Sequence, residues 1–156
     1  DVAYARCWLL DLDGYVVDAE DECEGAGMWR LRPFLERMRE LAPVAPIAVS
    51  GVGAAYYPWV RELDYAAVVD IADAFMPQCY PNQYGDVYSV PNCIAHADRA
   101  GIPSGMVVPT LGTYPGMYGY DPDVYAAQIA AAGTNGLNVF LGDTATDRDL
   151  AVLGRS

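Results

Sequence analysis

Short apolar runs alternate along the chain with segments whose apolar residues recur at helical spacing. Five apolar runs predict β-strands at residues 14–20, 46–51, 73–80, 104–112 and 136–143. The helical segments between and after them are residues 29–41, 58–72, 90–101, 121–133 and 144–154. Because apolar strands are each followed by a helix, the pattern predicts an α/β fold with a parallel sheet covered by helices.

The best-defined helix is predicted at 29–41. Its apolar residues recur at the spacing of one helix face and are Leu31, Phe34, Leu35, Met38 and Leu41. The next helix after the third strand has clear ends, because Ser89 can cap residues 90–101 and Gly101 can close them. Pro122 opens the helix at 121–133, and Gly133 closes it.

The charge of the chain limits its partners. The net charge is −12, and arginine supplies all nine fixed positive charges because lysine is absent. Such a surface repels nucleic acid phosphates and anionic membranes, so neither is expected as a partner. Charges, glycines or prolines interrupt every apolar stretch before it reaches the length of a membrane span.

The four cysteines and the single histidine do not form a metal motif. No CxxC pair occurs, and no histidine cluster lies near a cysteine, so a zinc site is not expected. Cys79 and Cys93 stand beside apolar residues and are predicted to be reduced thiols of the core. His96 falls in a helical stretch and is expected to be a partly buried helix residue.

The predicted strand 14–20 carries two carboxylates on one face. With a period of two, Val16, Asp18 and Glu20 share one face, and Tyr15, Val17 and Ala19 share the other. Asp18 and Glu20 then project together at the carboxyl end of the strand, where a parallel barrel places its catalytic groups. A carboxylate pair in which one pKa is raised is the equipment of glycoside hydrolysis.

The D-x-E spacing on this strand resembles the fourth strand of lysozyme-like and chitinase-like barrel hydrolases. "ADAFMPQCY" resembles the sixth strand, whose Gln and Tyr face the sugar, and "GMVVPTLGTY" and "GLNVFLGD" look like the seventh and eighth. The ordered series "GYVVDAEDECEG", "PIAVSGVG", "PWVREL", "FMPQCYPNQYGD" and "VVPTLGTY" is similar to TIM-barrel glycosidase-like domains of actinobacterial and phage proteins, including tail-associated ones. The resemblance covers most of the chain.

This resemblance implies a parallel (β/α) barrel. A complete barrel of this type needs about 200 residues or more. Residues 1–156 are therefore expected to be a single domain, the C-terminal five β/α units of a TIM-type barrel whose first strands are missing from this sequence. The remaining part of the barrel, or a homo-oligomer or virion assembly, would complete it.

The implied function is hydrolysis of a polysaccharide or peptidoglycan by paired-carboxylate chemistry, without a metal or other cofactor. Asp18 and Glu20 would be catalytic, with Glu20 as the general acid. The residues that would bind the polysaccharide or cell-wall glycan are Gln78, Tyr80, Tyr114 and Asp143. An extracellular or virion-associated location would fit this resemblance. The main alternative of another class is a non-catalytic structural or glycan-binding barrel of a phage tail.

Two metal-dependent alternatives remain open. The acidic cluster that follows the first strand could bind Ca²⁺ through Asp18, Glu20, Asp21, Glu22 and Glu24. "LLDLDG" resembles the first motif of the haloacid dehalogenase superfamily, which implies an Mg²⁺-dependent phosphatase with the site residues Asp11, Asp13, Ser50, Asp143 and Asp147. The chain departs from that family, because it has no lysine and no arginine between Arg99 and Arg148 to hold a phosphoryl group.

Overall fold

The computed structural model describes residues 13–19, 28–51, 65–81, 85–112, 122–133 and 136–140. Its strands are β1 (Tyr15–Asp18), β2 (Ile47–Gly51), β3 (Ala74–Cys79), β4 (Thr110–Gly112) and β5 (Asn138–Phe140). Its α-helices are α2 (Met28–Leu41), α4 (Val90–Arg99) and α5 (Pro122–Ala132). Short 3₁₀ turns are η2 (Tyr65–Val68), η3 (Asp86–Tyr88) and η4 (Ser104–Met106).

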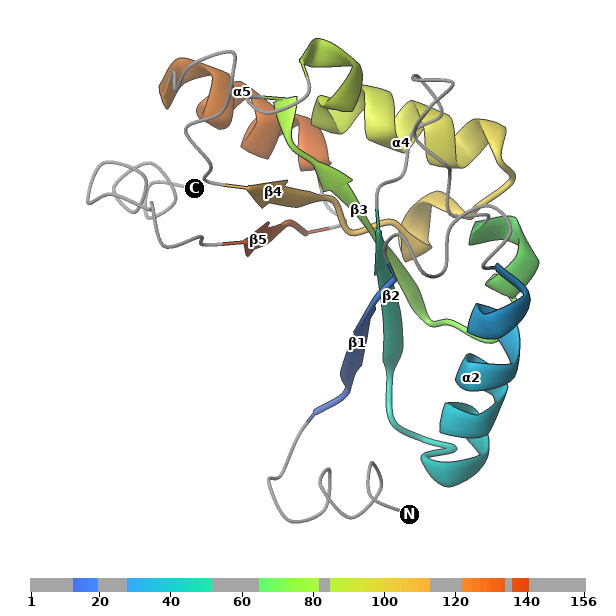
Figure 1. The fold of residues 1–156 in the computed structure, drawn as a ribbon. Helices are drawn as coiled ribbons and strands as arrows, with labels where there is room; N and C mark the ends of the chain where they lie inside the picture. The colour runs from blue at the N-terminus through green and yellow to red at the C-terminus, as the bar shows by residue number, and fades with distance from the viewer. Residues whose placement is uncertain are drawn as a thin grey trace.

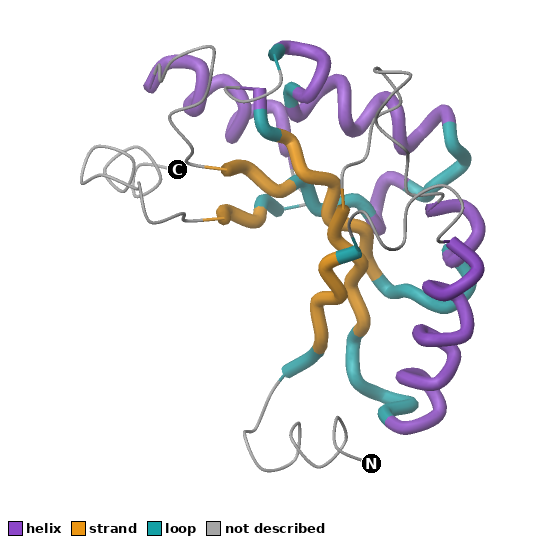
Figure 2. Tube along the Cα trace, viewed as in Figure 1, coloured by secondary structure: helices purple, strands orange, loops and turns teal. Residues whose placement is uncertain are grey.

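All five strands are parallel and follow one another in chain order, β1-β2-β3-β4-β5. The sheet curls into a half-barrel, with β1 and β5 at its two margins in the described part of the chain (Figure 1). The helices lie on the convex side and leave the concave side of the described sheet facing away from them (Figure 2). The predicted parallel α/β fold with five strands is therefore confirmed.

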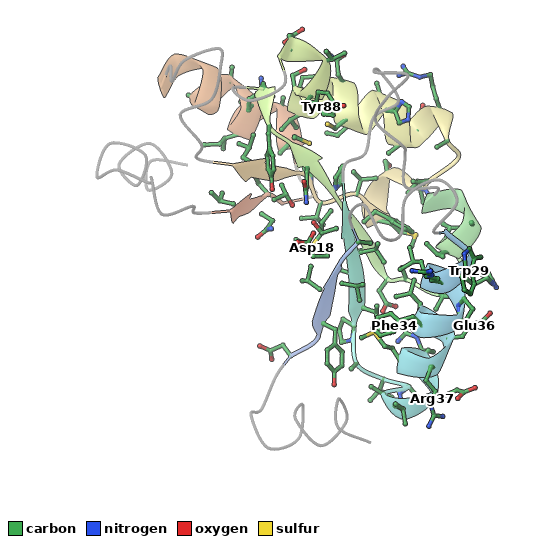
Figure 3. The ribbon with its side chains drawn as sticks, viewed as in Figure 1. Asp18, Trp29, Phe34, Glu36, Arg37 and Tyr88 are labelled. Atoms are coloured by element: carbon green, nitrogen blue, oxygen red, sulfur yellow. The ribbon has the colours of Figure 1, made fainter. Side chains whose placement is uncertain are left out.

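The larger core lies between the sheet and α2. Leu31, Leu35 and Met38 form the buried face of the helix and pack in one cluster with Ile47, Val49 and Phe75 of β2 and β3. Phe34 departs from the predicted apolar face, since 52% of it is exposed. It lies at the sheet margin, beside β1, where the described part of the chain has no further strand on that side (Figure 3).

A second core joins β3 and β4 to the two later helices. Its buried residues are Cys79, Val90, Cys93, Leu111 and Ala132. Both cysteines are fully buried and carry free thiols, as predicted from their apolar neighbours. Burial raises the pKa of the Cys79 thiol well above its usual value, and a hydrogen bond with the Cys93 side chain adds to the shift.

Two arginines of α2 fix the helix to the segment that leads into β3. Arg32 binds both carboxylate oxygens of Asp70, at 3.0 and 2.8 Å. Arg39 donates to Asp73 at 2.6 Å and to the backbone carbonyls of Ala45 and Ile71. Asp73 also accepts the backbone N–H of Ile47 at 2.8 Å, so one carboxylate ties together α2, β2 and β3 at the amino ends of the strands.

The structure corrects three sequence predictions. In place of a helix at 58–72, the described residues 65–71 form η2 and a turn. The strand predicted at 104–112 begins as η4 and becomes regular only at Thr110. Proline explains that shortening, because Pro103 precedes η4 and Pro109 has no N–H to give to a ladder. The helix predicted at 144–154 lies outside the described residues.

The third correction concerns the start of α4. Ser89 occupies the N-cap position, but its side chain makes no capping hydrogen bond. The N–H of Val90 instead donates to Oε1 of Gln128 on α5, at 2.5 Å. The predicted end of this helix holds, because Gly101 has a φ of 80°, which suits glycine at a helix C-terminus. His96 lies on α4 and is partly buried, as predicted.

Candidate functional site

The concave face of the half-barrel presents one polar side chain from every strand. Val17, Val49, Phe75 and Leu111 pack into the helix-facing cores, and side chains alternate along a strand. The residues between them therefore face the concave side. The polar ones form a row across the sheet, the polar row, which in strand order is Asp18, Ser50, Gln78, Thr110 and Asn138.

Asp18 and Gln78 are brought together across an intervening strand. Nε2 of Gln78 donates to Oδ1 of Asp18 at 3.2 Å, although 60 residues separate them in sequence. Ser50 is the residue of β2 in register with Asp18, and it lies between the two strands that the bond joins. Gln78 and Ser50 are 5% and 9% exposed, whereas Asp18 is exposed (Figure 3). The carboxylate of Asp18 is therefore accessible to solvent, whereas the polar side chains of Gln78 and Ser50 beside it are buried.

The Gln78 amide can act only as the donor in its bond with Asp18. An ionised carboxylate accepts hydrogen bonds but cannot donate them, so the NH₂ group must point toward Asp18. Hydrogen bonds to a charged group are stronger than neutral ones, which favours a single orientation of both side chains. Asp18 is thus held in place at the carboxyl end of β1.

A second polar pair continues the row on β4 and β5. Nδ2 of Asn138 donates to Oγ1 of Thr110 at 3.2 Å. Thr110 is 3% exposed and lies in register with both Gln78 and Asn138. Because a hydroxyl keeps its own hydrogen when its oxygen accepts, Thr110 retains a donor as well. The row therefore contains both donors and acceptors, and its exposed or partly exposed members are Asp18 and Asn138.

Of the residues predicted to form the glycan site, the structure places three. Asp18 and Gln78 are in contact, and Tyr80 follows directly after β3, where it is buried. Glu20, Tyr114 and Asp143 lie outside the described residues. The same holds for the other members of the predicted calcium cluster, which are Asp21, Glu22 and Glu24. Within the described ranges, no group of three or more His, Cys, Asp or Glu side chains could hold a metal ion.

The structure describes two of the five residues of the phosphatase alternative, Asp13 and Ser50. Asp11, Asp143 and Asp147 lie outside the described residues. Asp13 is exposed and precedes the amino end of β1, whereas Ser50 lies beside Asp18 at the carboxyl end. Five residues of extended chain separate those two levels, which corresponds to roughly 16 Å.

Two members of the row were missed by the sequence interpretation. Thr110 and Asn138 stood inside predicted strands without an assigned role. Period-two alternation could have found them, because each flanks a residue that faces the helices, Leu111 and Val139 respectively.

The arginines of the described segments stand apart from this row. All of them belong to α2 or α4 and none to a strand; they are Arg30, Arg32, Arg37, Arg39 and Arg99. Arg32, Arg37 and Arg39 form ion pairs with neighbouring carboxylates. Among the described residues, the charge on the concave face is therefore that of Asp18.

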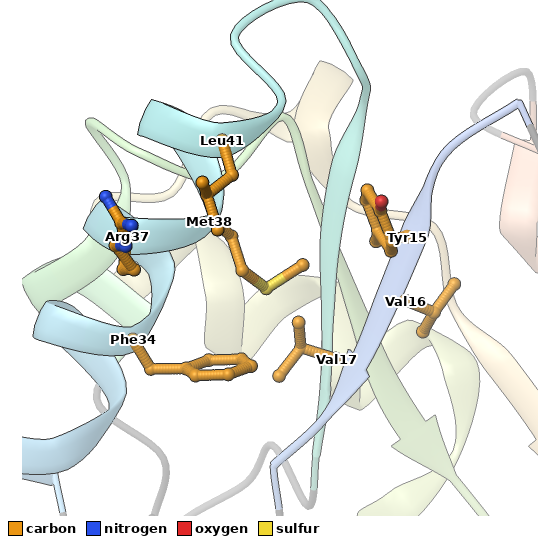
Figure 4. Close-up of a pocket in the computed structure, with 7 residues that line it drawn as sticks. All are labelled: Tyr15, Val16, Val17, Phe34, Arg37, Met38 and Leu41. Carbon is orange, nitrogen blue, oxygen red and sulfur yellow. The ribbon is translucent and has the colours of Figure 1, made fainter. Parts of the chain in front are cut away.

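An apolar pocket of about 340 Å³ lies elsewhere, between β1 and α2. Its lining residues are Tyr15, Val16, Val17, Phe34, Arg37, Met38 and Leu41 (Figure 4). Tyr15 and Val17 belong to the helix-facing side of β1, opposite to Asp18. None of the residues of the polar row lines this pocket.

Comparison of the chain with protein-family models, with curated proteins and with solved structures found no match. None of the helices in the described part of the chain is both long and apolar enough to cross a membrane.

Proposed function

We propose that the concave face binds a glycan and that the chain is a glycoside-hydrolase-like part of a TIM-type barrel. The observation that carries the proposal is the bond between Gln78 and Asp18 on the concave face. It orients a carboxylate at the carboxyl end of a strand, where barrel enzymes hold their reacting groups.

The polar row suits a ligand that is rich in hydroxyl groups. A sugar hydroxyl both donates and accepts, so it needs a surface on which both partners alternate. In that row, Asp18 is an exposed acceptor and Asn138 a partly exposed amide, and the buried side chains of Ser50, Gln78 and Thr110 support them. The sequential order of the five parallel strands supports the barrel part of the proposal, because strands of a (β/α)₈ barrel also follow one another in chain order.

The proposed chemistry assigns different tasks to the two carboxylates. Asp18, which the bond from Gln78 orients, would stabilise positive charge on the sugar or position a water molecule. Glu20, which is assigned from the sequence, would protonate the leaving oxygen as the general acid. A non-catalytic glycan-binding barrel is the second candidate, because the bond between Gln78 and Asp18 serves binding equally well.

The decisive experiment combines binding with hydrolysis. The protein is titrated with soluble oligosaccharides by calorimetry and is assayed for new reducing ends on peptidoglycan and simple polysaccharides. Glu20→Gln should lower hydrolysis by about 10²–10⁴-fold while binding persists. Asp98→Asn, which changes an exposed carboxylate on α4, is the matched control and should behave as wild type.

The other outcomes select among the alternatives. Binding without cleavage by the wild type supports the non-catalytic barrel. Full hydrolysis by Glu20→Gln removes that residue as the acid. Mg²⁺-dependent release of phosphate from an aryl phosphate, abolished by Asp11→Asn, would replace the glycan proposal with the phosphatase.

A further inference from the structure

The apolar pocket between β1 and α2 lies at the margin of the described sheet. Phe34, Met38 and Leu41 line it from the helix, and Val17 lines it from the helix-facing side of β1 (Figure 4). Phe34 is 52% exposed, although a large apolar side chain on the core side of a helix is ordinarily buried. An apolar surface therefore remains at this margin that a further segment can cover.

The order of the elements indicates which segment lies nearest. The helices α2, α4 and α5 lie on the convex side of the sheet, and each of them precedes a strand, β2, β4 and β5 respectively (Figure 2). The segment that precedes β1 is residues 1–12, which lie outside the described residues. Only Asp13 and Gly14 separate this segment from Tyr15, which lines the pocket. A helix before β1 on the same convex side would lie beside α2 and over the pocket.

Residues 1–12 read "DVAYARCWLLDL" and contain an apolar helix face. Four apolar residues recur at i, i+3, i+4 and i+7, and they are Ala5, Trp8, Leu9 and Leu12. The charged residues Arg6 and Asp11 fall outside that face. Seven helical steps cover about 10 Å, and the same number of steps leads from Phe34 to Leu41 along α2. The segment therefore offers an apolar face of the length that the pocket requires.

We propose that residues 1–12 pack as a helix against the pocket between β1 and α2, with Trp8 and Leu9 on Phe34. An aromatic pair of this kind contributes beyond the apolar area that it buries. The packed segment covers the helix-facing side of β1, and the opposite side of the same strand carries Asp18. The segment thus holds in place the strand that presents this carboxylate, whatever ligand the concave face binds.

Two neighbouring leucines provide a matched test of the packed face. Leu9 lies on the face that packs, and Leu10 lies on the opposite side of the same helix. Leu9→Cys and Leu10→Cys are each made in a Cys7→Ser background, and their labelling by a thiol reagent is located by fragment mass. Leu9→Cys should label about tenfold more slowly, because the reagent reaches it only when the segment separates from the pocket. Adding Phe34→Ala should accelerate the labelling of Leu9→Cys and leave that of Leu10→Cys unchanged.

A double-mutant cycle measures the contact between Trp8 and Phe34 directly. Trp8→Ala should lower the equilibrium constant for folding, measured by urea unfolding, about fivefold more in the wild type than in the Phe34→Ala background. Trp29→Ala is the matched control, because Trp29 lies on α2, is 69% exposed and has Arg30 over its ring. It should have the same effect in both backgrounds.

Each contrary outcome is specific. Equal labelling rates of Leu9→Cys and Leu10→Cys, or additive effects of Trp8→Ala and Phe34→Ala, overturn the inference. Protection of Leu9→Cys that increases with protein concentration also overturns it, since a second copy of the chain would then cover the pocket. Slow labelling that is independent of concentration, together with the coupling between Trp8 and Phe34, supports it.

Discussion

Gln78 donates to Asp18 across the whole width of β2. Ser50 of β2 is in register with Asp18 and with Met76, which stands two residues before Gln78 on β3. Neighbouring strands lie about 4.8 Å apart, so the bond joins side chains whose strands are nearly 10 Å apart. A small side chain near this point of β2 leaves room for the bond.

Ser50→Val should therefore separate Gln78 from Asp18. Valine places two methyl groups in the space that the bond crosses, and the loss of a hydrogen bond to a charged group is expected to weaken glycan binding by about tenfold. Calorimetry with the best oligosaccharide measures the change. Ala48→Val adds bulk to the same face of β2, two residues nearer its amino end, and should leave affinity within about twofold of wild type. Equal losses in both variants would show that bulk on β2, rather than this bond, decides affinity.

The side chain of Gln128 should stabilise the start of α4. Gln128→Met would leave the buried N–H of Val90 without its acceptor and should lower the free energy of unfolding by about 1–3 kcal/mol. Ala127→Met, at an exposed position of the same helix, is the control and should be close to neutral. Urea unfolding followed by circular dichroism measures both. If the two variants lose the same stability, the hydrogen bond is not what fixes α4 to α5.

Asp73 should make stability depend on pH. Desolvation raises the pKa of this carboxyl, but the hydrogen bonds from Arg39 and from the Ile47 N–H, with the charge of Arg39, outweigh it and leave the pKa lowered. A folded-state pKa below the unfolded value of about 3.9 contributes stability above that pH, and the contribution is lost as pH falls through the folded value. Asp73→Asn should thus cost about 0.5–1 kcal/mol at pH 7, since the carboxylate is half exposed.

Measurement of the urea midpoint from pH 7 to pH 3 tests this linkage. The difference between wild type and Asp73→Asn should narrow below about pH 4, where the wild-type carboxyl also becomes neutral. Asp98→Asn should follow wild type throughout. A difference between wild type and Asp73→Asn that stays constant with pH would contradict an ionic contribution.

Gly14 should not tolerate a side chain. A Cβ there would lie 2.7 Å from the carbonyl oxygen of Pro46, which accepts the N–H of Tyr15 at 2.8 Å. Gly14→Ala must displace β1 from β2 and should cost about 1–3 kcal/mol of unfolding free energy. Gly105→Ala, where nothing lies within 4 Å of the new Cβ, is the control and should be close to neutral. Similar denaturation midpoints for the two variants would be evidence against a close approach at Gly14.

The sequence predicts correctly those features that depend on residues close together along the chain. Alternation on the first strand assigned Asp18 to one face and Val17 to the other, and the structure separates them in that way. The cap of α4 was assigned to Ser89 because sequence proximity suggested it, whereas the acceptor comes from Gln128, 38 residues away. The same limit applies to Arg39, whose bonds to Ile71 and Asp73 depend on how α2 lies across the strands rather than on any local pattern.

The buried thiols of Cys79 and Cys93 can report how often the sheet and α4 separate transiently. Both are closed off from solvent between β3 and α4, and the raised pKa of the Cys79 thiol leaves it little of the reactive thiolate at neutral pH. A thiol reagent therefore reaches them chiefly when the sheet and the helix separate. The labelling rate of Cys79 and Cys93, resolved by peptide mass from that of the other cysteines, counts those openings in the unmodified chain, at the place where β3 carries Gln78 toward the concave face.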